Sequence, residues 1–160
     1  MNQKSDRLIL YQLNAHYMIF IKILLISFLL FSEKAYCRSL QPKTNTHLEQ
    51  KEIENLLIEN SKKLNKSLPV MIDSQTRLDT TFAAGMVMHY KCTLININSD
   101  QVDADLFHTE LKSQLIKSLK AEKSAMFLVN NGVFIVYYYF DKNGVLITSI
   151  RFDAASFGME

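Results

Sequence analysis

The stretch His89-Tyr90-Lys91-Cys92 places an imidazole, an amine and a thiol side by side in the sequence. Nucleophilic catalysis by cysteine uses such groups, because a neighbouring base or cation lowers the pKa of the thiol. The side chains of a β-strand, however, point alternately to opposite faces. We therefore expect His89 and Cys92 on opposite faces of one strand, which does not make a catalytic pair.

The residues around this stretch alternate between an apolar and a more polar face. The apolar face consists of Met86, Met88, Tyr90, Cys92 and Leu94. The other face consists of Val87, His89, Lys91 and Thr93. We expect the apolar face to contact the core, with Cys92 as a small buried hydrophobe and His89 facing solvent.

A second polar group comprises Asp73, Arg77 and Asp79 in the segment IDSQTRLD. Arg77 and Asp79 are two residues apart and so share a strand face. An arginine held between two carboxylates could grip an acidic group of a partner. The alternative is a surface salt bridge worth well under ~1 kcal/mol. We take these three residues as candidate binding residues.

Three consecutive tyrosines, at positions 137 to 139, divide between the two faces of a further strand. Tyr137 and Tyr139 share a face with Val133 and Ile135, whereas Tyr138 lies with the phenylalanines on the other face. Tyrosine offers a large contact area at low entropic cost. We take Tyr137 and Tyr139 as candidate binding residues, the alternative being that a helix covers them.

The sequence lacks the common catalytic and cofactor-binding motifs. It contains no glycine-rich phosphate loop, no Gly-x-Ser-x-Gly elbow, no paired-histidine metalloprotease motif and no paired-cysteine metal knuckle. We therefore expect no metal, no cofactor and no enzymatic activity. The alternative is a hydrolase-like enzyme with a site assembled from the dispersed residues Asp73, Arg77, Asp79 and His89.

The segment MIFIKILLISFLLFSEKAYCRS, which begins at Met18, has the anatomy of a signal peptide. A lysine near its start precedes a short apolar run, and polar residues follow. Small residues at Ala35 and Cys37 suit cleavage between Cys37 and Arg38. The seventeen residues before Met18 add nothing that export requires, which favours Met18 over Met1 as the native start.

An uncleaved membrane anchor is the competing interpretation of the same segment. The clean apolar run, residues 23–31, is about half of the ~20 residues that a spanning helix requires. We therefore predict a leader over residues 1–37, a flexible lead-in over 38–46 and one domain over 47–160.

Removal of the leader leaves a chain of balanced charge with one thiol. The leader takes four of the 18 Lys and Arg residues and two of the 16 Asp and Glu residues, so that fourteen of each remain. A neutral domain gives no reason, from its composition, to expect binding to nucleic acid or to an anionic membrane surface. With Cys37 removed, Cys92 is the remaining cysteine, and no internal disulfide is expected.

Periodicity and turn signals predict the elements of the domain. Helices are expected over about 47–66 and 103–120, with a short third helix from 122 to the Asn130-Asn131-Gly132 stop. Two short extended pieces precede a long strand over 86–98, and an Asp141–Gly144 turn joins two final strands. This order predicts an α+β two-layer sandwich, with an antiparallel sheet of four to five strands packed against two main helices.

Two segments, LNKSLPVMIDSQTRLDTTFAAGMVMHYKCTLIN and FLVNNGVFIVYYYFDKNGVLITSIRFD, resemble a family of small exported proteins of uncharacterised role from Gram-negative bacteria. The similar features are the Asn65-Lys-x-Leu-Pro69 helix end, the Thr76-Arg-Leu-Asp79 strand, the aromatic-rich long strand and the Asn131-Gly-Val133 entry to the hairpin. The resemblance implies a cysteine pair near Ala121 and Ala155, which this chain lacks. It implies no catalytic residues.

The sequence therefore predicts a periplasmic or secreted binding domain. Its expected partner is another protein or peptide of the cell envelope, held on an exposed face or edge of the sheet. The alternative is an accessory of an envelope or secretion complex that is anchored in the inner membrane and faces the periplasm.

Overall fold

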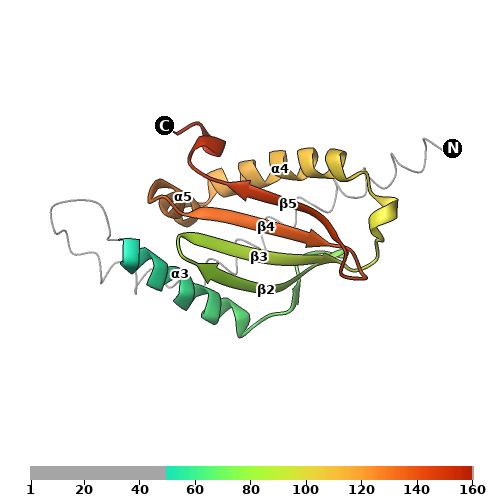
Figure 1. The fold of residues 1–160 in the computed structure, drawn as a ribbon, viewed down its shortest axis with the longest axis horizontal. Helices are drawn as coiled ribbons and strands as arrows, with labels where there is room; N and C mark the ends of the chain where they lie inside the picture. The colour runs from blue at the N-terminus through green and yellow to red at the C-terminus, as the bar shows by residue number, and fades with distance from the viewer. Residues whose placement is uncertain (1–49, 160) are drawn as a thin grey trace.

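The computed structural model describes residues 50–159, so the predicted leader, the lead-in and the start of the domain lie outside the described residues. The helices are α3 (Gln50–Asn65), α4 (Ala104–Ala121) and α5 (Lys123–Asn130), with short 3₁₀ turns η1 (Ser99–Gln101) and η2 (Ala155–Phe157). The strands are β1 (Val70–Met71), β2 (Thr76–Ala84), β3 (Val87–Leu94), β4 (Phe134–Phe140) and β5 (Leu146–Phe152). Figure 1 shows their arrangement.

The five strands form one sheet in the order β1-β2-β3-β4-β5. The pairs β1–β2, β2–β3 and β4–β5 are antiparallel, whereas β3 and β4 are parallel. The α+β class is confirmed, but the expectation of an antiparallel sheet throughout was wrong. Parallel neighbours need a long crossover, and the segment carrying α4 and α5 supplies it by returning the chain to the starting end of β3 (Figure 1).

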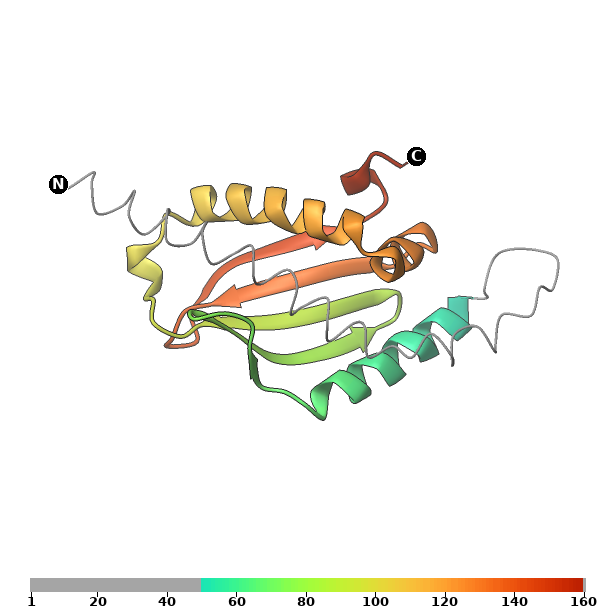
Figure 2. The same ribbon diagram turned by 180° about the vertical axis from the view of Figure 1, so that it is seen from behind.

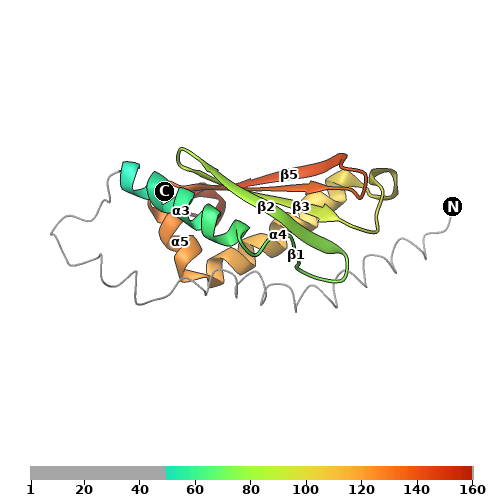
Figure 3. The same cartoon turned by 90° about the horizontal axis from the view of Figure 1, so that it is seen from below.

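The helices lie on one side of the sheet, which leaves the other side without a helix among the described residues (Figure 3). Seen from behind, α3 runs along the β2 margin and α4 along the β5 margin (Figure 2). The described part of the chain is therefore a two-layer structure, as predicted, with a single core between the layers.

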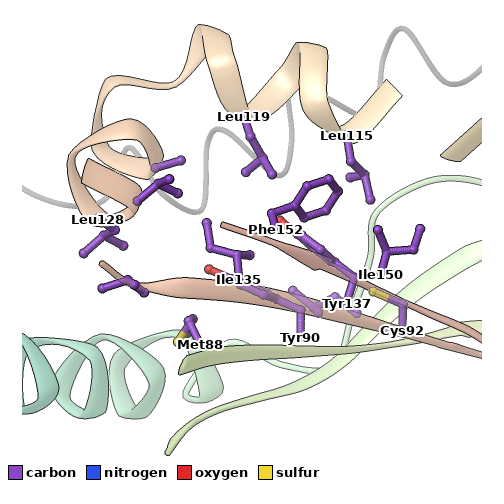
Figure 4. Packing of buried hydrophobic residues seen from close by; sticks show 14 of the residues in the cluster. Met88, Tyr90, Cys92, Leu115, Leu119, Leu128, Ile135, Tyr137, Ile150 and Phe152 are labelled. Atoms are coloured by element: carbon purple, nitrogen blue, oxygen red, sulfur yellow. The ribbon is translucent and has the colours of Figure 1, made fainter. Parts of the chain in front are cut away.

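The core lies between the sheet and the apolar stripes of the helices. Leu111, Leu115 and Leu119 recur every four residues on α4 and are buried, as expected for a helix that covers a sheet with one face. They pack over residues of β3, β4 and β5, among them Tyr90, Cys92, Ile135, Tyr137, Ile150 and Phe152 (Figure 4). The strand β4 lies inside the sheet, in agreement with its apolar character on both faces.

The predicted element ends agree with the structure in most places. The Asp103 carboxylate caps α4 by accepting hydrogen bonds from the backbone N–H groups of Asp105 (3.1 Å) and Leu106 (3.0 Å). The Asn143-Gly144 turn joins β4 to β5, and Gly144 has the positive φ of 82° that such a turn favours. The long strand ends at Leu94 rather than near Asn98, because the chain turns there into η1.

Candidate binding face

The outward side chains of β2 to β5 on the helix-free side form a surface that we call the open face. The strand pairing places its members: the residues are Arg77, Asp79, Phe82, Val87, His89, Lys91, Thr93, Phe134, Val136, Tyr138, Phe140, Ser149 and Arg151. Side chains alternate between the two faces along each strand, and the register shift between Leu78 and Thr80 interrupts this alternation in β2. Five of these side chains are aromatic or imidazole rings.

A row of rings crosses the strands at the centre of the open face. The rings of Phe82 on β2 and His89 on β3 are stacked, with centroids 4.2 Å apart and an interplanar angle of 9°. The His89 ring also lies over Tyr138 on β4 at 5.8 Å, and its Nδ1 is 3.2 Å from the Tyr138 hydroxyl. Phe82 is 46% exposed. The row therefore presents an exposed aromatic edge beside a polar hydroxyl.

Two cations lie over aromatic rings on either side of this row. The Arg151 guanidinium carbon is 3.8 Å from the centroid of Phe134, and the Lys91 Nζ is 4.7 Å from the centroid of Phe140. The negative face of an aromatic ring attracts a cation. A guanidinium stacked in this way keeps its N–H donors free to point outward. The rings thus hold both charges in place on the surface.

These side chains form a layer that substitutes for a helix. Val136 is only 9% exposed although it points to the open face, and it lies outside the main core cluster. Its cross-strand neighbours on this face are His89 and Arg151. The layer of rings and cations therefore shields the apolar centre of the sheet from water.

Polar groups of β2 and β3 form the margin of the open face. The Arg77 Nε donates to the Asp79 carboxylate, which also accepts a hydrogen bond from the Thr93 hydroxyl. The strand β2 has a bulge at this point, since Leu78 and Thr80 pair out of register. Burial lowers the pKa of His89, which favours the neutral ring that can stack and accept a hydrogen bond.

The predicted candidate residues fall in three different places. Arg77 and Asp79 lie together on the open face, as their spacing indicated. Asp73 lies in the β1–β2 turn, where its carboxylate accepts hydrogen bonds from the backbone N–H groups of Gln75 and Thr76. Its observed contacts are therefore those of a turn residue.

Tyr137 and Tyr139 are 1% and 4% exposed, so the structure corrects the expectation that they line a recognition surface. Tyr137 pairs with Tyr90 of β3, which faces the core, and the two rings stack at 4.8 Å. The alternative that helices cover this face is confirmed. The member of the run that lies on the open face is Tyr138, which is half-buried. The sequence did not single it out, because the register between β3 and β4 cannot be derived from local periodicity.

Cys92 and His89 lie on opposite faces of β3. Cys92 is fully buried in the core, and burial raises the pKa of its thiol. His89 points to the open face. The predicted placement of these two side chains on opposite faces of one strand is thus confirmed.

Residues 50–159 contain neither a candidate metal centre nor a helix that could span a membrane. This part of the chain contains no group of three or more His, Cys, Asp or Glu residues placed to hold a metal ion. None of its helices combines the length and the apolar character needed to cross a membrane.

Comparison with known proteins shows the fold. No protein family model matches the chain, and no curated protein matches it in sequence. A crystal structure of a Pseudomonas aeruginosa protein provisionally classed as secreted matches with a TM-score of 0.57 at 19% identity, covering 70% of this chain and 98% of that protein. This chain shares its fold.

Two pilotins of bacterial secretion have the same fold. The pilotin EpsS of the Vibrio vulnificus type 2 secretion system matches with a TM-score of 0.57 at 16% identity, covering 68% of this chain and 94% of EpsS. The type II secretion system pilotin AspS from Vibrio cholerae matches with a TM-score of 0.53 at 15% identity, covering 67% of this chain and 94% of AspS. The described domain therefore corresponds to nearly the whole of each.

Proposed function

We propose that this protein is an exported, non-enzymatic accessory of the bacterial cell envelope that binds another protein through the open face. The observation that carries the proposal is the half-exposed row of Phe82, His89 and Tyr138 on a sheet face without a helix. Exposed apolar patches rimmed by polar groups are typical of interaction sites. Aromatic side chains and arginine dominate the centres of protein interfaces.

The fold supports the same class of function. Two of the solved structures that share it are pilotins of type II secretion systems, and a third is a bacterial protein provisionally classed as secreted. We extend this to the present chain as a role in assembling or escorting a component of an envelope complex. The signal peptide predicted for residues 1–37 would deliver the domain to the envelope.

Two exposed apolar side chains provide a matched test of the open face. Phe82 lies on the open face and Ile58 lies on α3, and they are 46% and 39% exposed. We expect Phe82→Ser to reduce co-purification of the envelope partner about tenfold or more, as expected for an interface anchor. Ile58→Ser should leave it unchanged. The measurement is the partner recovered with the tagged native protein, normalised to the protein itself.

The thermal unfolding of both variants is the control, because surface substitutions usually change the free energy of unfolding by less than about 0.5 kcal/mol. Equal losses for the two variants, or no loss for Phe82→Ser, would show that the open face is not the binding site.

N-terminal sequencing of the same native protein separates the two modes of export. A start at Arg38 in the soluble fraction supports a released domain, whereas a start at Met1 or Met18 in membranes supports the anchored accessory.

A further inference from the structure

The charges on the open face indicate the chemistry of the partner. The face carries three cations, Arg77, Lys91 and Arg151, against one carboxylate, that of Asp79. Asp79 is already engaged by Arg77 and Thr93. The surface is thus basic although the predicted mature chain is balanced in charge.

Lys91 and Arg151 are the two cations that remain available for a ligand. The ion pairs found among the described residues are Lys62–Glu59 and Arg77–Asp79, neither of which involves them. The carboxylate of Asp153, beyond the end of β5, accepts hydrogen bonds from the backbone N–H (2.9 Å) and hydroxyl (2.8 Å) of Ser156. These hydrogen bonds lower its pKa, and the charge of Arg151 lowers it to a smaller extent. Lys91 and Arg151 both lie over rings, so little side-chain entropy remains to be lost on binding.

The rings that hold the two cations set the spacing of these charges. The Lys91 amine lies over Phe140 and the Arg151 guanidinium over Phe134, and these two rings are six residues apart on β4. Six residue steps of about 3.3 Å place the two charges about 20 Å apart. Between them lie the ring of Tyr138 and the apolar side chain of Val136.

We propose that the open face binds an acidic segment of a partner protein, in which two carboxylates about 20 Å apart flank an apolar side chain. The carboxylates pair with Arg151 and Lys91, and the apolar side chain packs against Tyr138 and His89. Residues thirteen apart on a helix are separated by about 19.5 Å, and residues six apart in an extended chain by about 20 Å. Both match the cation spacing. This proposal rests on the proposed function, since it names the ligand of the same face.

The arginine makes a carboxylate the best match among anions that proteins present. A guanidinium binds a carboxylate with two parallel hydrogen bonds, and stacking on Phe134 leaves its edge free for that geometry. An anionic membrane surface is the weaker fit, because it favours clusters of lysine and arginine on a strongly basic protein. On this face only three cations are spread among rings.

The test uses a photo-cross-linking amino acid at position 149 of the full chain in the native cells. Ser149 is exposed and lies in the same cross-strand row as Lys91 and Tyr138. Mass spectrometry identifies the cross-linked segment. We expect a protein segment with two carboxylates flanking an apolar residue. A synthetic peptide of that segment is then titrated against the purified full chain.

Charge variants separate the role of each cation. Lys91→Gln and Arg151→Gln should each weaken peptide binding about tenfold, a loss in the range of one charge-assisted hydrogen bond. Arg151→Lys should recover part of the affinity because it restores the charge. Lys120→Gln removes an exposed lysine of α4, outside the open face, and should change binding less than twofold. Replacing the two carboxylates of the peptide by amides should weaken binding as much as Lys91→Gln and Arg151→Gln combined in one chain.

The outcomes distinguish this proposal from the proposed function. A cross-linked protein segment without paired carboxylates, or binding that is unchanged in Lys91→Gln and Arg151→Gln, would overturn the acidic ligand and leave protein binding in place. Adducts with lipid or glycan only, or no protein adduct at position 149, would overturn both.

Discussion

The Cys92 thiol is enclosed by the core between β3 and the helices. Burial raises its pKa, and the negative charge of Asp79 raises it further, which outweighs the lowering by a hydrogen bond with Tyr139. The thiolate is the nucleophile in alkylation. We expect iodoacetamide to modify Cys92 more than about 100-fold more slowly in the native protein than in guanidinium chloride, because reaction requires opening of the core.

Peptide mapping measures this rate at Cys92 alone, so that Cys37 does not interfere if it is retained. The control is the same reaction in the unfolded chain, where the thiol has its ordinary reactivity. Rapid labelling of the folded protein would contradict the burial of this side chain and reopen a reactive role for it.

At the level of single residues, the alternation of side chains along a strand predicted which face of the sheet several of the candidate residues occupy. It placed Cys92 in the core, His89 opposite to it, and Arg77 on the same face as Asp79, and the structure agrees on each. It could not decide between Tyr137 and Tyr138, because β4 is apolar on both faces. That choice depends on the pairing of Tyr90 with Tyr137, a long-range contact that local periodicity does not contain.

At the level of elements, α3 protects the outer edge of β2. The strand β1 pairs with β2 only at Leu78 and Arg77, so the later part of β2 has no strand partner on that side. There the Asn65 side chain donates to the Thr81 carbonyl (2.7 Å) and accepts from the Thr81 backbone N–H (2.8 Å). Ser61 donates to the same carbonyl (3.1 Å). An exposed edge invites pairing with other chains, and the end of α3 blocks it.

We expect Asn65→Ala to lower the free energy of unfolding by about 1 to 3 kcal/mol, because it leaves a buried backbone donor without its partner. Asn55→Ala is the matched control, since Asn55 is an exposed residue of the same helix. Its expected change is within about 0.5 kcal/mol. Urea unfolding followed by circular dichroism measures both. Equal stabilities of the two variants would show that the contacts with Thr81 contribute little.

The parallel pairing of β3 with β4 is the feature of the elements that the prediction missed. Helices between two strands indicate a crossover to a parallel neighbour, and α4 and α5 were both expected between these strands. The final hairpin dominated the prediction because its Asn143-Gly144 turn is a strong local signal. The bulge after Leu78 had no comparable signal in the sequence.

At the level of the whole molecule, one helix layer covers one face of the sheet, and side chains must cover the other. Rings and cations do this over Val136. The turn that joins β4 to β5 begins at Asp141, which is 1% exposed. Its carboxylate accepts hydrogen bonds from the backbone N–H groups of Ser99 (3.0 Å), Asn143 (2.8 Å) and Val145 (2.8 Å). It thus joins the hairpin to the segment that leaves β3.

Asp141 should couple the stability of the domain to pH. Burial alone would raise its pKa, but the hydrogen bonds from Val145, Ser99 and Asn143 outweigh burial and lower it below the ordinary value of 3.8. The folded state therefore binds this proton less readily than the unfolded state, so the contribution to stability is present above about pH 4 and is lost as the pH falls through the lowered pKa.

We expect Asp141→Asn to lower the Tm by about 5 °C at pH 7, because the amide replaces one acceptor oxygen by a donor. Below pH 4 the wild-type Tm should approach that of the variant. Asp100→Asn, at an exposed position in η1, should follow the wild-type curve throughout. If the Tm of Asp141→Asn and that of the wild type fall in parallel down to pH 2, another carboxylate governs acid unfolding. The contact between the β4–β5 turn and the segment after β3 would then not depend on the charge of Asp141.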